Sequence, residues 1–256
     1  MIKFNNKTYN LLIIFFYYSI LLLILERYLC FSNGLYWESF YNNPNYLSLC
    51  KDLAFDFWGE NKLIENFQVI FLLLSLIYFF VIIKKLKNNF FMYYYFVVCF
   101  IGMFYFLGEE ISWGQHFFQW NSPNFFISHN NQNETNLHNM SNLFNEVPRY
   151  LVLFFCCFSP FSVLFFKKFF INKKSISFLL LPNPKILIIC ASLIFFTIPD
   201  LILSKLDLEI YFQRITFNFL RVSELQELIV AFYFFIYSSS INECLNKKRY
   251  NYFFRF

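Results

Sequence analysis

Six long apolar stretches, separated by polar segments, dominate the pattern along the chain. They cover approximately residues 10–31, 63–83, 90–107, 150–166, 186–203 and 222–241. Each is close to the roughly 20 apolar residues that a helix needs to cross a bilayer. The pattern therefore predicts an all-α, polytopic membrane protein with six transmembrane helices. Two long loops, at about 32–62 and 108–149, are expected on one side, and residues 1–256 are expected to form a single integral membrane domain.

Positively charged side chains alternate along this pattern and give the predicted orientation. Fourteen of the 21 Lys and Arg residues precede the first stretch, follow the sixth, or lie in the second and fourth connections. Cytoplasmic loops carry the excess of Lys and Arg, so we expect a multi-pass inner-membrane protein with both termini in the cytoplasm. Fifteen of the 16 acidic residues and all 3 histidines fall on the outer side. This asymmetry predicts a polar site at the outer helix ends.

Composition and charge narrow the classes of function. The chain is 58% hydrophobic and only 14% charged, whereas about a quarter of the residues in a soluble domain are charged. The net charge of +5 could indicate nucleic acid as a partner. Because the cations gather in the inner loops, membrane lipids are the expected partners and nucleic acid is not. The seven Cys residues form no Cys-x-x-Cys pair and are expected to be buried thiols.

The first candidate site follows the third apolar stretch. Glu109 and Glu110 end an apolar helix, where carboxylates need water, a cation or an Arg partner. Helix-compatible residues continue to Trp120, so we expect the helix to continue and to place Glu109, Ser112 and His116 on one face. The functional interpretation is a metal site or a general acid/base pair. The structural alternative is a set of hydrated carboxylates at the membrane interface.

A second candidate site lies in an amide-rich run, and two further acids open predicted helices. Glu134 and His138 have i, i+4 spacing, which lets a carboxylate and an imidazole reach one cation on a helix. The amides around them could instead form a polar loop without a ligand. Glu65 and Glu227 lie near the starts of the second and sixth helices, where acids complement the helix dipole. Both are expected deeper than a first-turn role requires.

These groups are predicted to converge at the outer end of the bundle. The candidate catalytic residues are Glu109, Glu110, Ser112, Glu134 and His138. The candidate metal ligands are Glu110, Glu134, His138, Glu227 and Glu65. Whether the site holds a divalent cation or performs acid/base chemistry directly stays open. If a cation is bound, oxygen-rich ligation favours Ca²⁺, Mg²⁺ or Mn²⁺ over zinc, and the single His leaves room for iron.

Two runs in the second long loop carry a resemblance to a known family. Glu-Glu-Ile-Ser-Trp-Gly-Gln at 109–115, and Asn-x-Gln-x-Glu-x-Asn-Leu-His-Asn at 130–139, resemble a family of uncharacterised bacterial polytopic membrane proteins. The segments 58–65 and 223–228 fit the same pattern. The resemblance implies the polytopic fold and supplies no activity.

A fainter similarity is to alkaline ceramidase-like membrane hydrolases. Asp56-x-Trp58-x-Glu60-Asn61, followed by Glu65, resembles the calcium-binding segment of those enzymes, and Ser112-x-x-x-His116 resembles their intramembrane Ser and zinc-ligand His. That similarity would imply a hydrolase with calcium and zinc. The chain departs from the family because no His follows residue 138 to complete a three-His zinc site.

Three functions compete. The leading hypothesis is a membrane-embedded enzyme that acts on a lipid or lipid-linked substrate at the outer face. The alternatives are an ion- or proton-coupled transporter and a non-catalytic membrane assembly or docking protein. A transporter needs polar groups near the bilayer midplane, and the middles of spans two to four hold almost none, which favours a site at the surface. The segment 34–62 carries several charges and is expected to lie at the outer interface as a helix or ordered loop.

Overall fold

The described part of the chain is built from helices, with no strand among its residues. The computed structural model describes residues 6–31, 63–130, 134–137, 140–141, 147, 150–156, 158, 186–205 and 222–247. The long helices are α1 (Asn6–Phe31), α4 (Leu63–Lys85), α5 (Phe90–Glu110), α9 (Ile186–Lys205) and α11 (Val222–Lys247). The 3-10 turn η1 (Ser112–Gly114) and the short helices α6 (Gln115–Phe118) and α7 (Asn124–His129) follow α5. The prediction of an all-α fold is confirmed for these residues.

Four described helices are long and apolar enough to cross a membrane. The qualifying stretches are Thr8–Leu25, Leu63–Lys85, Phe90–Glu110 and Glu224–Asn246. In α9 the apolar stretch, Ile186–Thr197, is shorter. The predicted fourth span has only residues 150–156 and 158 described, as helix, and the segment 34–62 lies outside the described residues. Four apolar helices fit a membrane protein, and the count of six spans stays a prediction.

The chain forms two compact units. The first contains Met1–Asn66 and Phe195–Leu228, and the second contains Phe67–Ile194 and Ile229–Phe256. In the first unit, one face of α1 is buried at Tyr9, Ile13, Phe16 and Ile20. Also in this unit, the Gln226 side chain donates to the Phe196 carbonyl at 3.4 Å, which joins α11 to α9. The prediction of a single domain over 1–256 stays untested.

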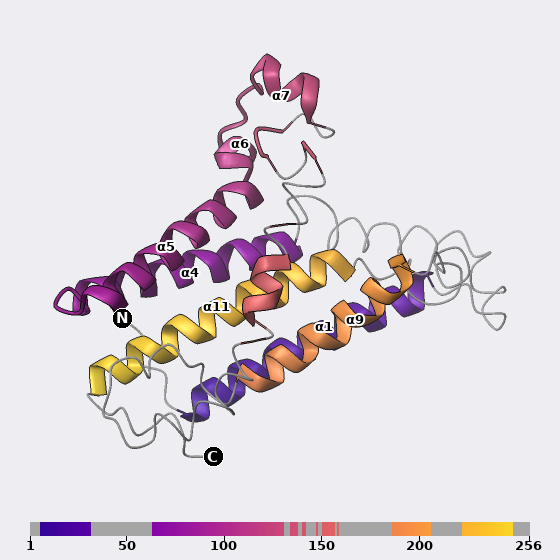
Figure 1. The fold of residues 1–256 in the computed structure, drawn as a ribbon. Coiled ribbons are helices and arrows are strands. Elements are labelled where there is room, and N and C mark those ends of the chain that lie inside the picture. Colours follow the sequence, from indigo (N-terminus) through magenta and orange to yellow (C-terminus); the bar gives the residue numbers. More distant parts are fainter. Residues whose placement is uncertain are drawn as a thin grey trace. The chain divides into compact units, whose positions relative to one another are not determined.

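In the second unit, α4 and α5 form a helical hairpin (Figure 1). The Asn89 side chain caps α5 by accepting a hydrogen bond from the Met92 amide at 3.1 Å. Such a cap satisfies an amide that the first helical turn leaves without a partner. One face of α5 is buried at Met92, Phe96, Met103 and Leu107, while the opposite face exposes a stripe at Tyr94, Val98, Ile101 and Phe104. Both faces are apolar, as expected of a helix that faces lipid on one side.

α11 is the most enclosed of the candidate spans: 89% of an 18-residue apolar stretch of it is buried, against 22% for the corresponding stretch of α5. Phe71 of α4 packs on Phe232 and Phe235, and Phe79 packs on Tyr237, so α4 and α11 run parallel. Near the C-terminal end of α4, Lys85 Nζ donates to the Asn242 and Asn246 side chains, both at 2.6 Å. We call this contact the lysine clamp. It joins α4 to α11 where Lys85 itself is exposed.

Candidate functional site

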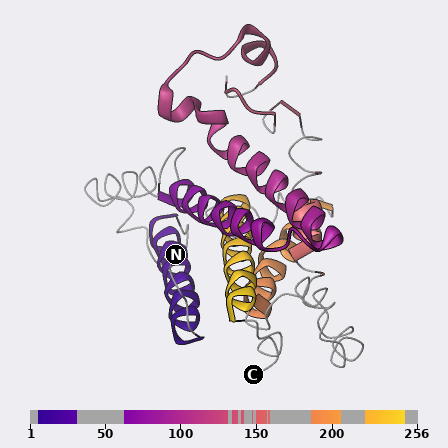
Figure 2. The same ribbon diagram turned by 90° about the vertical axis from the view of Figure 1, so that its left-hand side faces the viewer.

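The C-terminal end of α5 closes with a left-handed turn. Ser112, Trp113 and Gly114 have φ values of 46°, 53° and 96°. Left-handed backbone is unfavourable for residues with a Cβ, at about 1–3 kcal/mol each. The prediction that the helix continues to Trp120 is therefore wrong: α5 ends at Glu110, and the turn redirects the chain into α6 (Figure 2). His116 consequently does not share a helical face with Glu109, and its side chain lies outside the described part.

This turn folds the Trp113 ring back over the last turn of α5. A Cβ on Gly108 would lie 2.9 Å from three atoms of that ring, so any larger residue at 108 would force the ring to shift. The indole Nε1 of Trp113 donates to Glu109 Oε1 at 2.9 Å. The glycine and the turn together therefore bring an N–H donor onto a buried carboxylate.

Glu109 is 4% exposed, which makes its partners important. In addition to the indole N–H, its Oε2 accepts the Leu137 backbone amide at 2.7 Å. Short bonds of this kind to a carboxylate are among the stronger hydrogen bonds in proteins and offset the loss of hydration. Glu109 thus joins the end of α5 to the segment 134–137.

Ser112, Glu134 and Asn136 form the centre of the site. The Ser112 hydroxyl donates to Glu134 Oε2 at 2.7 Å. The Asn136 amide donates to the same carboxylate oxygen at 2.7 Å and to Ser112 Oγ at 2.9 Å. Asn130 holds Asn136 in turn, donating to its Oδ1 at 2.8 Å and to its backbone carbonyl at 3.0 Å. A hydroxyl is therefore paired with a carboxylate, and a third side chain orients both.

Gln115 completes the contact between the two segments. Its Oε1 accepts the Thr135 amide at 2.7 Å, and its Nε2 donates to Ser122 Oγ at 2.9 Å. Along the α5 end, Glu109, Ser112 and Gln115 therefore meet Leu137, Asn136 and Thr135 in reverse order. We call these contacts between 109–122 and 130–137 the outer network, after the side of the membrane on which the sequence predicts them.

The predicted site residues have different outcomes. Ser112 and Glu134 are in direct contact, and Glu109 binds the same four-residue segment. Glu110 is the half-buried last residue of α5, and His138 lies outside the described residues. Glu65 is in the first turn of α4, contrary to our expectation of a deeper position, so a role at the helix dipole suffices for it. Glu227 lies beyond the first turn of α11 and, like Glu65, belongs to the first unit.

The described residues give no support to the predicted metal centre. Within them, no three His, Cys, Asp or Glu side chains lie close enough to hold a metal ion. The proposed ligand set of Glu110, Glu134, His138, Glu227 and Glu65 stays a prediction, because His138 lies outside the described residues and Glu65 and Glu227 belong to the other compact unit. Among the contacts of the described residues, the carboxylates of Glu109 and Glu134 accept hydrogen bonds from neutral donors.

Sequence reasoning missed several members of the outer network. Trp113, Gln115, Asn130 and Asn136 supply donors or acceptors at its core, yet none was a candidate. One signal was present: Glu109, Ser112 and Gln115 recur every three residues, opposite an amide-rich run. Amides and hydroxyls at a regular spacing, next to a second polar run, are suited to mutual hydrogen bonding.

No known protein-family model, curated protein or solved structure matches the chain. The resemblance to a bacterial membrane-protein family therefore stays a prediction.

Proposed function

We propose that this protein is a membrane-embedded enzyme that acts on a lipid or lipid-linked ester at its outer face. The observation that carries the proposal is the Ser112 hydroxyl bonded to Glu134 Oε2 at 2.7 Å, with Asn136 orienting both groups. A nucleophile within hydrogen-bond reach of a base that a third group orients is the general arrangement for covalent catalysis. The left-handed backbone of Ser112 and Trp113 adds support, because strained residues cluster at functional sites.

The membrane topology proposed for this enzyme has six spans, two long outer loops and cytoplasmic termini, in the inner membrane. The parallel packing of α4 and α11 supports it. Because α5 returns the chain to the outer side, an even number of crossings must lie between α5 and α11. Two crossings, through 150–166 and α9, satisfy this condition and agree with the basic inner loops.

In the proposed reaction, Ser112 Oγ attacks the carbonyl carbon or phosphorus of the ester. Glu134 accepts the hydroxyl proton as the new bond forms, and passes it to the leaving oxygen as the old ester bond breaks. Water then releases the group held on Ser112, with Glu134 taking one proton of the water and returning it to Ser112. Ser112 is fully buried, so the segment 134–137 must move away from η1 before a substrate reaches the hydroxyl.

The test uses full-length protein in nanodiscs that contain lipids extracted from the native membrane. Mass spectrometry follows the lipid products, and a fluorophosphonate probe reports an activated serine. We expect product formation and probe labelling to be lost in Ser112→Ala and reduced by a factor of about 100 or more in Glu134→Gln. Ser122→Ala is the matched control, since Ser122 is also buried in the outer network but bonds Gln115 and Thr135.

Equal probe labelling of the wild-type and Ser112→Ala proteins would overturn the enzyme proposal. So would wild-type protein that neither labels nor changes any lipid. Those results would favour the assembly or docking hypothesis, because the Glu109 and Glu134 carboxylates already accept several structural hydrogen bonds. Ser75, Ser238 and Ser240 in the described spans each donate to a carbonyl of their own helix, so these hydroxyls lend no support to a transport pathway.

A further inference from the structure

The segment that follows the turn is uncharged and displays aromatic side chains. From residue 111 to residue 133 the sequence has no Asp, Glu, Lys or Arg. Its exposed large apolar side chains range from 39% exposed at Trp113 to 77% at Phe118. The others are Phe117, Trp120, Phe125 and Ile127. A stretch of this length facing water would ordinarily carry several charges, at about a quarter of its residues.

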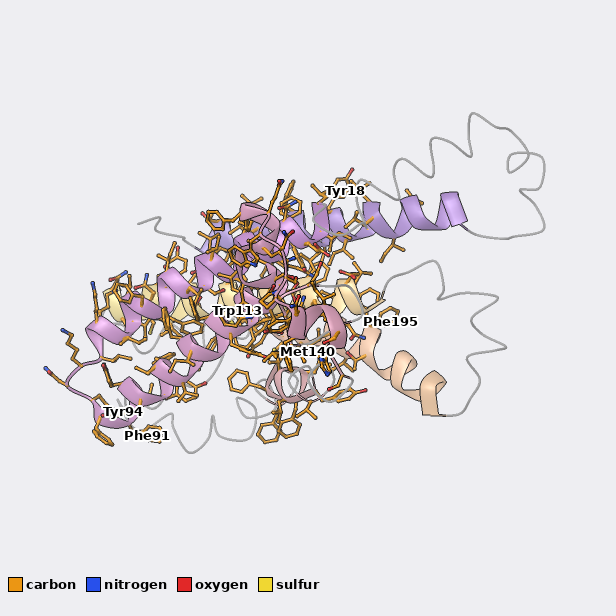
Figure 3. All side chains as sticks on the ribbon, turned by 90° about the horizontal axis from the view of Figure 1, so that it is seen from above. Tyr18, Phe91, Tyr94, Trp113, Met140 and Phe195 are labelled. Carbon is orange, nitrogen blue, oxygen red and sulfur yellow. The ribbon has the colours of Figure 1, made fainter. Side chains whose placement is uncertain are left out.

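This surface is continuous with the exposed face of α5. The Trp113 ring contacts Phe104 and Tyr105, with ring centroids 6.1 and 6.2 Å apart. Phe104 ends the exposed apolar stripe of α5 that includes Val98 and Ile101. Figure 3 shows Trp113 at the opposite end of α5 from Phe91 and Tyr94. The side of α5 suited to lipid therefore extends past the end of the helix onto Trp113.

Hydrogen bonds and ring contacts give the segment a definite shape. Phe118 and Trp120 stack with centroids 6.0 Å apart and an interplanar angle of 5°. The Gln115 to Ser122 bond closes the loop beneath them. In α7, Phe125 stacks on His129 at 4.8 Å, leaving the Phe125 ring exposed. The aromatic groups are thus presented by an ordered scaffold.

We propose that residues 113–127 form an interfacial anchor, which binds the phospholipid surface at the C-terminal end of α5. Tryptophan and other aromatic side chains favour the boundary between headgroups and acyl chains. An uncharged segment enters that boundary without the desolvation penalty of an ionised group. The occupant is the bilayer itself, because the surface continues a lipid-facing helix and offers no charge to a protein partner. This anchor does not depend on the proposed enzymatic function.

The test measures the depth of Trp120 in liposomes. Trp37 and Trp58 are replaced by Phe in the full chain, Trp113 is kept because it bonds Glu109, and the emission of Trp120 is taken as the difference between this protein and its Trp120→Phe variant. Phosphatidylcholine brominated near the carbonyl end of its acyl chains is compared with aqueous iodide as quencher. We expect the bromolipid to quench at least about half of the emission and iodide to quench little, since an anchored indole lies below the headgroups.

A pair of substitutions at one exposed position serves as the control. Phe118→Leu keeps an apolar side chain and should retain the bromolipid quenching. Phe118→Asp introduces a charge and should lower it by at least about half. Strong iodide quenching of Trp120 in the starting protein would overturn the proposal, whether or not Phe118→Asp folds. Shielding of Trp120 from both quenchers, with a dimer mass, would assign the surface to a second copy and also overturn it.

Discussion

Polar side chains join helices or segments at both ends of the α4–α5 hairpin, but in different ways. The lysine clamp uses one exposed cation and two neutral amides on regular helices. The outer network uses the buried Glu109, the half-buried Glu134, and buried hydroxyls and amides around a left-handed turn. The length of the Lys side chain explains the clamp: its charged amine stays in contact with water while its apolar stem lies along the helices. The outer network needs every partner in place, since buried polar groups are costly when they lose one.

The comparison separates structural need from candidate function. Ordinary helix packing requires no left-handed backbone, and the clamp shows none at Lys85, Asn242 or Asn246. The outer network combines strained residues with buried Glu109 and a Ser112–Glu134 pair. Departures from local rules are expected at functional sites. Four substitutions test whether the two ends differ in energy as this account requires.

The largest effect is expected for Glu109→Ala. It leaves the Trp113 indole N–H and the Leu137 amide without their acceptor, so the free energy of unfolding should fall by about 2–4 kcal/mol. Trp113→Phe removes only one donor, so it should lower the free energy of unfolding by about half as much. Equilibrium unfolding in mixed micelles titrated with SDS measures both. Equal, near-zero losses would mean that Glu109 does not hold the network.

The next effect is expected for Asn136→Asp, which replaces a donor with a carboxylate oxygen next to Glu134 Oε2. Like charges this close should destabilise the protein by about 2–3 kcal/mol at pH 7. The loss should shrink as the pH falls, since protonation of the introduced carboxyl removes the repulsion. Asn88→Asp, at an exposed position outside the interfacial anchor, is the control. A pH-independent loss would contradict the Asn136–Glu134 contact.

Gly108→Ala follows, because its Cβ would displace the Trp113 ring. Overpacking of this kind typically lowers stability by about 1–3 kcal/mol. Gly102 in the same helix has nothing within 4 Å of its Cβ position, so Gly102→Ala should be neutral or stabilising. Thermal unfolding of the two variants gives the comparison. A Gly108→Ala protein that unfolds like Gly102→Ala would remove the need for glycine at 108.

The sequence predicted the helices better than the site. Long apolar runs located α4 and α5 within a few residues, and α11 continues six residues past its predicted end, to Lys247. The turn at 112–114 could not be predicted, since Ser112 and Trp113 are compatible with a helix and their φ values depend on contacts with Gly108 and the segment 134–137. Spacing along one helix does not show which partners a distant amide-rich segment supplies.

The smallest effect is expected at the lysine clamp. Lys85→Met keeps the apolar stem and removes the two hydrogen bonds to Asn242 and Asn246. At this exposed position it should lower the free energy of unfolding by about 1 kcal/mol or less. Lys84→Met is the matched control, since Lys84 lies over the Phe80 ring at 4.2 Å and is also exposed. The same SDS titration applies. A loss at Lys85 larger than that at Glu109 would reverse the comparison.

Hydrogen exchange at the Leu137 amide tests the central claim most directly. The claim is that the segment 134–137 is docked on the end of α5, and the Leu137 N–H is the donor that buried Glu109 holds at 2.7 Å. We expect this amide to exchange on the order of 100-fold more slowly than unstructured chain, and to lose that protection in Glu109→Ala. Exchange at the unstructured rate in the wild-type protein would contradict the docked arrangement, and with it the Ser112–Glu134 site.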